Sequence, residues 1–350
     1  MVPMKKKIVI LTGNKIFFGQ TRKPWVSMNV AKMEKIFQEH GFKVERYSFH
    51  QIVNRQDRIK DSVIFYTFSQ KMNRRSYIID LIHYLDDGSN IFIPSSELLQ
   101  CHENKGYQEL YKKKINFTSL KAFYFSSVEE IQHYDIIFPV VLKTVDTSNG
   151  KGVFLVQNYR QLVKHIQHFE RQGMLTKIDL VRRKYFRRKK FYKEYPDYNN
   201  RIDYFEYRDY ILKEKNFILQ EFIPDLKSDH RVLVLYDKYY VMKRFTREGD
   251  FRASGTKIQD YNVEFDLDLM NYAKEVYDQF DTPFLSMDIG IHQKKYSLFE
   301  FQAVHFGLNV FVKTKGYYTL DNGDWKFIEA KSTIEKEMAE ALIKYIQLRG

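Results

Sequence analysis

FLSMDIG at residues 284–290 and YSLFEFQ at 296–302 are the segments that decide how this chain is interpreted. Both are rich in apolar and aromatic residues, and the short polar segment between them favours two successive strands. Asp288 lies on the first strand, while period-two alternation places Glu300 and Gln302 on one face of the second. Mg²⁺ prefers oxygen ligands and usually bridges carboxylates to substrate phosphates, so these three residues predict a magnesium site.

A second interpretation of Asp288 needs no metal. A carboxylate in so apolar a strand is costly unless it is paired or binds a cation. Lys243 and Arg244 end another predicted strand, residues 239–244, and either could form a salt bridge with Asp288. The sequence leaves both interpretations open.

Phosphate-handling residues are predicted upstream, in FPVVLKTVDTSNGKGVFLV at residues 138–156. Lys143 ends one strand, and the glycine-containing loop from Thr144 to Gly152 leads into the next. Such a loop can lay backbone N–H groups over phosphates, and a lysine at a strand end supplies a fixed positive charge. A simple β-hairpin with a polar turn is the alternative.

The segment ILQEFIPDLKSDHRVLVL, residues 218–235, has the pattern of a hinge beside a nucleotide. Backbone groups around Gln220 and Glu221 could bond an adenine, and the downstream carboxylate of Asp229 could meet the ribose hydroxyls. Both acids could equally be ordinary strand-end residues. The segment alone does not decide between these roles.

The N-terminal part of the chain predicts a parallel sheet. KKIVILTGN reads as a strand that runs into a loop, and Val30, Met33 and Phe37 then recur at helical spacing. Further strands and a helix follow, which gives the β-α alternation typical of a sheet covered by helices on its faces. We therefore expect an α/β (α+β) fold, with an N-terminal domain at 1–100 and further domains at 101–215 and 216–350.

The positive charge is concentrated in one place. The chain has 57 Lys and Arg against 44 Asp and Glu, and residues 182–193 (RRKYFRRKKFYK) hold eight of the basic residues with no acid. They lie in a basic insertion at about 177–210, of which 194–210 reads as a loop. The segment could bind an anionic glycan, a nucleotide-sugar, a lipid headgroup or, less in keeping with the absence of known motifs, nucleic acid.

Composition also predicts the compartment. No apolar run approaches the roughly 20 residues of a membrane span, so no transmembrane segment is expected, and the charged start does not have the pattern of a secretory signal. The single cysteine, Cys101, excludes an internal disulfide. We expect a cytoplasmic protein.

Taken in order, the segments from about 101 to 312 resemble the ATP-grasp superfamily, whose nucleotide-binding domain has two lobes and follows an N-terminal α/β domain. The resemblance implies ATP and Mg²⁺ as cofactors and a carboxylate-amine ligase as the activity. It implies that the nucleotide is bound by Lys105, Lys143, the hinge Gln220, Glu221, Phe222 and Ile223, and the ribose acid Asp229, and that Asp288, Glu300 and Gln302 hold the metal.

The same resemblance assigns the catalytic residues. Arg244 matches a basic residue near the reacting phosphoryl group, and GDFRASG at 249–255 resembles a mobile loop over the substrates. The chain departs from the family pattern twice: Gln302 replaces the usual Asn, and Ser286 stands where some members have an arginine. Arg244 or Arg252 is therefore expected to stabilise the tetrahedral intermediate.

The substrates predicted by the resemblance are a small-molecule carboxylate, on an amino acid or an anionic sugar, and an amine. Loops at the carboxyl ends of strands in open α/β sheets bind ligands. Asn14, Gln20, Arg22, Lys23 and Trp25 follow the first strand and are expected in the acceptor site, or in a solvated loop. An ATP-grasp kinase and a binding protein for nucleic acid or an anionic surface are the alternative functions.

Overall fold

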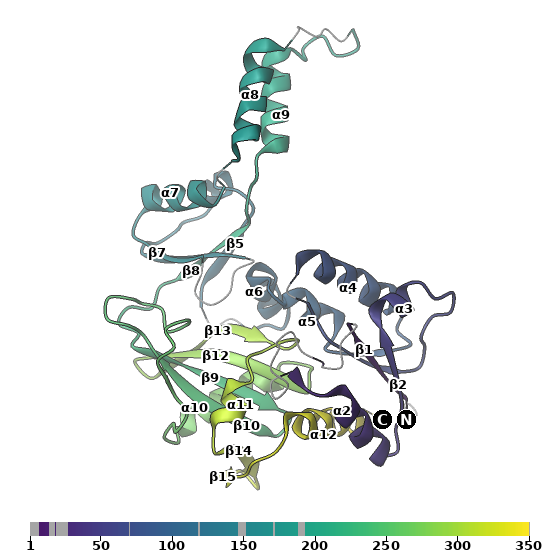
Figure 1. The fold of residues 1–350 in the computed structure, drawn as a ribbon. Helices are drawn as coiled ribbons and strands as arrows, with labels where there is room; N and C mark the ends of the chain where they lie inside the picture. The colour runs from purple at the N-terminus through teal and green to yellow at the C-terminus, as the bar shows by residue number, and fades with distance from the viewer. Residues whose placement is uncertain are drawn as a thin grey trace. The chain divides into compact units, whose positions relative to one another are not determined.

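The computed structural model describes residues 7–13, 18, 27–69, 71–117, 120–145, 152–170, 172–187 and 193–349, without the side chain of residue 72. Their backbone divides into two compact units (Figure 1). One comprises the described residues of 7–121 and 223–349, and the other those of 122–145 and 152–222. The predicted acids Asp288 and Glu300 belong to the first unit, and Lys143 belongs to the second.

The first unit opens with the predicted parallel sheet, in the order β2-β1-β3-β4. Apolar side chains without polar alternation fill β1 and β3, as expected for parallel strands that are covered on both faces. The elements of this part are β1 (Lys7–Thr12), α2 (Val30–Glu39), β2 (Lys43–Ser48), α3 (Phe49–Val53), β3 (Val63–Tyr66), α4 (Met72–Leu85), β4 (Ile91–Ile93), α5 (Ser96–Cys101) and α6 (Lys105–Lys114).

A second, antiparallel sheet makes up the rest of the first unit. Its strands follow the order β13-β12-β9-β10-β14-β15, and β11 pairs with β10. The elements are β9 (Ser228–Leu235), β10 (Lys238–Phe245), β11 (Gln259–Asp260), α10 (Leu267–Asp278), β12 (Phe284–His292), β13 (Lys295–Gln302), α11 (Asn309–Lys313), β14 (Gly316–Asp321), β15 (Asp324–Glu329) and α12 (Ile334–Gln347).

The C-terminal helix α12 joins the two sheets of this unit. Its buried residues Ile334, Met338 and Leu342 belong to one apolar core with residues of α2, β1, β9 and β10. Its Glu335 accepts a 2.7 Å hydrogen bond from the backbone N–H of Asn29, just before α2. The buried apolar residues of this helix recur at helical spacing, so its apolar stripe faces the core.

The second unit is a four-stranded sheet with helices, and its strands follow the order β5-β8-β6-β7. It contains β5 (Ala122–Phe125), η1 (Glu129–His133), β6 (Val140–Thr144), β7 (Val153–Val156), α7 (Tyr159–Phe169), α8 (Met174–Phe186), α9 (Asn200–Ile211) and β8 (Phe217–Glu221). Within this unit, α8 and α9 run side by side away from the sheet (Figure 1). The expected loop at 194–210 is thus wrong for most of its length.

Polar contacts explain why α9 escapes a search for helical periodicity. The side chain of Asn199 caps the helix by accepting bonds from the N–H groups of Arg201 and Ile202. The one fully buried residue of α9 is Asp203, which binds Arg183 of α8. An apolar stripe is the usual signal of a packed helix, whereas this helix packs through charge.

Candidate active site

The sheet of the first unit places the predicted acids on neighbouring strands. Asp288 of β12 lies opposite Glu300 of β13 on one side and Arg231 of β9 on the other. Two residues before Arg231 on β9, Asp229 lies opposite Arg244 of β10. Cross-strand partners have Cβ atoms only about 5 Å apart, so the charged side chains of four strands meet on this face.

Four of these side chains form an alternating network of charges. Arg231 donates two bonds to Asp288, 2.8 and 2.9 Å long. Arg244 reaches the same carboxylate at 2.8 Å and donates two further bonds, of 2.6 and 2.7 Å, to Asp229. Paired bonds between guanidinium and carboxylate groups fix both planes, so the two arginines are held in defined orientations.

The network is buried, and its charges depend on one another. Burial by itself would raise the pKa of Asp288, but the attraction of Arg231 and Arg244 outweighs it and holds that pKa well below its usual range. Burial raises the pKa of Asp229, with Arg244 opposing the effect. Asp288 is therefore the carboxylate that stays ionised to the lower pH. The attraction of Asp288 and Asp229 outweighs burial and raises the pKa of Arg244.

Glu300 and Gln302 are brought together as predicted. The amide nitrogen of Gln302 donates a 3.0 Å bond to the Glu300 carboxylate. The amide oxygen of Gln302 is buried and accepts no hydrogen bond of normal geometry from the described residues, although the Gln302 side chain lies close enough to the His102 ring to oppose the fall in its pKa. An unpaired buried oxygen beside a carboxylate fits a cation ligand, because leaving it unpaired is otherwise costly.

Asp288 differs from these two residues. Its carboxylate is paired with Arg244, the partner that the second interpretation of the sequence proposes, and with Arg231. In the described part of the chain, no three His, Cys, Asp or Glu residues are arranged to hold a metal. The pairing does not test the metal assignment, and a cation at Asp288 would have to share the carboxylate with two arginines.

Arg231 is a site residue that the sequence analysis misses. It stands two residues after Asp229 on β9, so strand alternation alone places it on the same face. A Cβ added to Gly307 would lie 3.5 Å from its guanidinium, which shows that the loop after β13 passes close by. Counting two residues on from Asp229 along the predicted strand would have found Arg231.

The other nucleotide residues predicted in the first unit are Lys105 and Ile223. Lys105 is buried in the first turn of α6, which Asn104 caps by accepting a bond from the N–H of Tyr107. Ile223 is half-buried in the segment before β9. Both oxygens of Asp229, the predicted ribose ligand, already accept bonds from Arg244. All three roles remain predictions.

Lys143 and the hinge lie together in the second unit. Lys143 of β6 donates a 2.6 Å bond to the side-chain oxygen of Gln220 on the adjacent strand β8. The amide nitrogen of Gln220 is buried and has no partner among the described residues.

Of the other predicted hinge residues in this unit, Glu221 is exposed and Phe222 is half-buried. The antiparallel pairing of β6 with β7 agrees with a hairpin, while residues 146–151 of the expected phosphate loop lie outside the described residues.

Arg252 lies away from this network, in the segment between β10 and β11. Its guanidinium binds the carboxylate of Asp250 at 2.9 Å, and the hydrogen bond to Asp250 raises its pKa. Thr256 anchors the same segment by donating a 2.8 Å bond to the carbonyl of Phe245. The expected roles of Arg252 and of 249–255 as a covering loop remain predictions.

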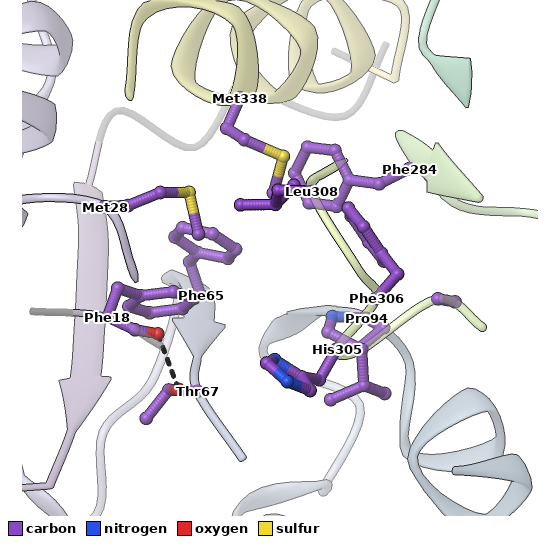
Figure 2. A pocket seen from close by; sticks show the side chains of 12 residues that line it. Phe18, Met28, Phe65, Thr67, Pro94, Phe284, His305, Phe306, Leu308 and Met338 are labelled. Atoms are coloured by element: carbon purple, nitrogen blue, oxygen red, sulfur yellow. Dashed lines mark hydrogen bonds between the residues drawn. The ribbon is translucent and has the colours of Figure 1, made fainter. Parts of the chain in front are cut away.

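A small pocket lies where β3 and β4 of the first unit end (Figure 2). Phe18, Phe65 and Met28 line one side, and the loop that follows β13 lines another with His305 and Phe306. Thr67 donates a 2.9 Å bond to the carbonyl of Phe18, which fixes the rim. The predicted acceptor residues Asn14, Gln20, Arg22, Lys23 and Trp25 lie outside the described residues, but Phe18 of the same segment belongs to this pocket.

Two neutral histidines lie on this side of the molecule. Burial lowers the pKa of His305. Burial, and then the charge of His305, lowers the pKa of His102 to about 3. The two rings are 6.2 Å apart, and His102 packs edge-on against Phe68 at 3.9 Å. Both imidazoles are therefore uncharged at neutral pH.

A family model for the RimK-like ATP-grasp domain matches residues 102–190, about a quarter of the chain. A search of curated proteins finds no match. Among solved structures, D-cycloserine synthetase DcsG aligns at 9% identity with a TM-score of 0.55, over 97% of this chain and 99% of that one. PsnB, titled an ATP-grasp ligase complexed with precursor peptide PsnA2 and AMPPNP, aligns at 10% identity and a TM-score of 0.50, over 99% of both chains.

A third structure, the Chryseobacterium gregarium RiPP-associated ATP-grasp ligase in complex with ADP and a leader and core peptide, aligns at 13% identity and a TM-score of 0.50, over 97% of both chains. These matches confirm the predicted mixed α/β fold. Residues 102–190 match the RimK-like type of ATP-grasp domain, and over nearly its whole length the chain has a fold similar to that of ATP-grasp ligases. The predicted enzyme class, an ATP-grasp ligase, is the class that the PsnB and Chryseobacterium titles name.

Proposed function

We propose that the protein is an ATP-dependent ligase that activates a carboxylate as an acyl phosphate and couples it to an amine. The observation that supports this most is the fixed pair of arginines, Arg231 and Arg244, beside Glu300 and the unpaired oxygen of Gln302. The arginines suit negative charge, and the oxygens suit a cation. Phosphoryl transfer requires such positioning and charge neutralisation more than it requires a protein nucleophile.

In the first step, a substrate carboxylate oxygen attacks the γ-phosphorus of ATP and ADP leaves. Arg244 and Arg231 are oriented by Asp229 and Asp288 before substrate arrives, so they stabilise developing phosphoryl charge without reorganising. Glu300 and Gln302 would hold Mg²⁺, which would neutralise phosphate charge. Lys143 is proposed to contact the nucleotide phosphates.

In the second step, the amine nitrogen attacks the carbonyl carbon of the acyl phosphate, loses a proton, and phosphate leaves. The tetrahedral intermediate carries an oxyanion, which a guanidinium stabilises. Carboxylates of neighbouring strands fix Arg244 and Arg231 on the sheet beside Glu300, whereas Arg252 binds Asp250 in the segment between β10 and β11. We therefore favour the two strand arginines over Arg252 for this role.

The pocket narrows the class of substrate. Its side chains are mostly aromatic and aliphatic, and its histidine is kept neutral by burial. Such a lining favours an apolar substituent and disfavours an anionic sugar, because a charge there would be desolvated without a partner. We propose an amino-acid or peptide substrate with a small apolar group. This extends to our chain the peptide binding that the titles of PsnB and the Chryseobacterium ligase state for those proteins.

The location remains a proposal as well. No helix in the described ranges is long and apolar enough to cross a bilayer. The single cysteine, Cys101, is buried and unpaired. A lone reduced thiol suits the cytoplasm, which we propose as the compartment.

Hydroxylamine trapping tests the acyl phosphate. Enzyme, Mg-ATP and hydroxylamine are incubated with amino acids and short peptides of increasing side-chain size, and with uronic acids, while ADP and hydroxamate are measured together. We expect ADP and hydroxamate to rise in equal amounts with an apolar amino acid or peptide. A stable phosphorylated hydroxyl with no hydroxamate would instead establish an ATP-grasp kinase.

A further inference from the structure

The inner side of helix α8 is polar. Arg183 donates bonds of 3.3 and 3.1 Å to Asp203 of α9, and Arg187 binds the same carboxylate. Tyr207 of α9 donates to Asp179, and the Arg183 guanidinium lies 3.6 Å from the centre of the Tyr207 ring. The two helices of this hairpin are therefore joined by charged and hydroxyl groups, where helix pairs usually bury apolar side chains.

The outer side of α8 is apolar. Met174, Ile178, Val181 and Tyr185 follow one another at intervals of four, three and four residues, which places them on one face of the helix. Their exposed fractions are 80%, 56%, 51% and 67%. Leu175 and Phe186 are also exposed and lie further around the helix, on the far side of Arg182. Helix α8 has no buried residue, and the side chains of the stripe face away from the protein.

Basic side chains border this apolar face. On a helical projection, Lys177 and Lys184 lie along one edge of the stripe and Arg182 lies along the other. All three are exposed, and Arg182 also contacts Asp179 at 3.2 Å. A helix with an apolar stripe, aromatic rings and flanking lysines has the pattern of one that lies in the plane of a membrane surface. Lysine stems reach along apolar surface while their charges stay in water.

We propose that the outward face of α8, comprising Met174, Leu175, Ile178, Val181, Tyr185 and Phe186 with Lys177, Arg182 and Lys184, docks on a bilayer that contains anionic phospholipid. The basic edges complement the negative headgroups, and the apolar stripe enters the boundary between headgroups and acyl chains. Tyr185 suits that boundary because its ring is apolar and its hydroxyl is polar. The docking is peripheral, since the helix is too short and too charged to span.

The opposite edge of the hairpin offers a contrast. The outward residues of α9 include the exposed Ile202 and Phe205. Arg201 and Arg208 lie over the Phe205 ring, but Glu206 and Asp209 on the same side of the helix offset their charge. These acids would be repelled by anionic lipid. A membrane therefore favours α8 over α9, although both edges carry exposed apolar side chains.

Vesicle co-sedimentation tests the proposal with the full-length protein. The probes are vesicles of phosphatidylglycerol mixed with phosphatidylcholine, and vesicles of phosphatidylcholine alone. We expect binding to the mixed vesicles only, and weaker binding as salt rises, because ions screen the attraction. Replacing Lys177 and Lys184 by Gln should weaken binding roughly fivefold for each charge removed.

A matched pair of double variants locates the face. Ile178→Ser with Val181→Ser should reduce vesicle binding by roughly tenfold or more, because two inserted side chains are lost. Ile202→Ser with Phe205→Ser removes two apolar groups from α9 and should leave binding unchanged. Circular dichroism and ATP turnover serve as controls that both variants keep the fold.

Absence of binding to the mixed vesicles at low salt would overturn the proposal, and so would equal losses of binding in the α8 and α9 variants. A dimer, detected by light scattering, that Ile178→Ser with Val181→Ser dissociates would also overturn it, since the face would then bind a second copy of the chain. Binding of single-stranded RNA through α8 without vesicle binding would do the same. Variants of the active site should bind vesicles normally even where they lose ligase activity. Failure of the proposed ligase function can therefore be told apart from failure of the proposed membrane docking.

Discussion

The protein contains two clusters of paired arginines and aspartates, one within a sheet and one between two helices, and their structural roles differ. In the sheet of the first unit, Arg231 and Arg244 bind Asp288, and Arg244 also binds Asp229. In the hairpin of the second unit, Arg183 and Arg187 bind Asp203. In the first cluster the side chain of Arg244 is 5% exposed and that of Arg231 is 25% exposed, whereas in the second cluster both arginine side chains are 20–25% exposed.

The difference shows how the setting of an ion pair determines its use. In the sheet, apolar side chains pack on the other face, so the charged face is free to hold arginines ready for a ligand. In the hairpin, the charges occupy the place between two helices, and the apolar side chains are left outside. The same residue types therefore build a preorganised site in one unit and expose an apolar surface in the other.

Among the substitutions in the two clusters, removal of Asp288 should cause the largest loss of folding stability. Asp288→Ala leaves the half-buried Arg231 and the buried Arg244 without their shared counter-charge, and breaking a buried ion pair in this way typically costs up to about 3–5 kcal/mol. Urea unfolding measures this, with Asp288→Asn as the isosteric partner that keeps the volume. If both variants unfold at the wild-type urea concentration, the network contributes nothing to stability and the comparison fails.

ATP turnover should depend on residues of the two sheets, Glu300 and Lys143, and not on the arginines of the α8–α9 hairpin. Glu300→Ala and Lys143→Ala should each lower Mg-dependent ATP turnover by about 10²–10³-fold, since one fixed electrostatic contact with phosphate is typically of that size. Arg187→Gln in the hairpin is the control and should turn over normally. Normal turnover by the Glu300 variant would exclude it as a metal ligand.

Low pH should destabilise the first unit, because its buried histidines are uncharged in the folded protein. The pKa of His102 is about 3 in the folded protein and near 6.5 when unfolded, so the unfolded state binds the extra proton between these values. Stability is therefore complete above pH 6.5 and falls as the pH drops toward 3. His102→Leu should retain up to about 3 kcal/mol more stability at pH 4 than wild type, relative to pH 7, in urea titrations. Parallel pH profiles for the two proteins would contradict this.

The smallest effect is expected in the hairpin cluster. Asp203→Asn should weaken the contact between α8 and α9 by about 1–2 kcal/mol, because the partner arginines remain partly solvated. Amide exchange in both helices should then be roughly 5–30-fold faster, while exchange in β9 and β12 stays the same. Faster exchange in the sheet as well would mean that the two clusters are coupled.

Strand and helix patterns predicted most of what positions the site. Buried parallel strands, the stripe of α12 and the pairing of β12 with β13 all follow from apolar periodicity, which is strong where one face meets a core. Alternation also brings Glu300 and Gln302 together. These features depend on local spacing, which a sequence displays directly.

Features that depend on partners distant in the sequence could not be predicted in the same way. Arg231 pairs with a carboxylate 57 positions away, and Arg183 with one 20 positions away. Nothing local distinguishes such an arginine from a solvated one. The helix α9 was missed for the same reason, because its buried residue is an aspartate whose partner lies on α8.

A bulge in β13 makes the length of this hairpin as important as its composition. Asp288 pairs with Glu300 and Ile289 with Leu298, so Phe299 has no partner and its ring covers Gly290, where an added Cβ would lie 2.0 Å from the ring. The extra residue lets Glu300 face the site while Leu298 stays in the core. Deleting Phe299 should therefore remove the bulge and leave Glu300 and Leu298 on their present faces. In this hairpin the bulge residue can be lost more easily than a residue that pairs across the two strands, because losing a paired residue shifts the register by one and turns side chains to the other face.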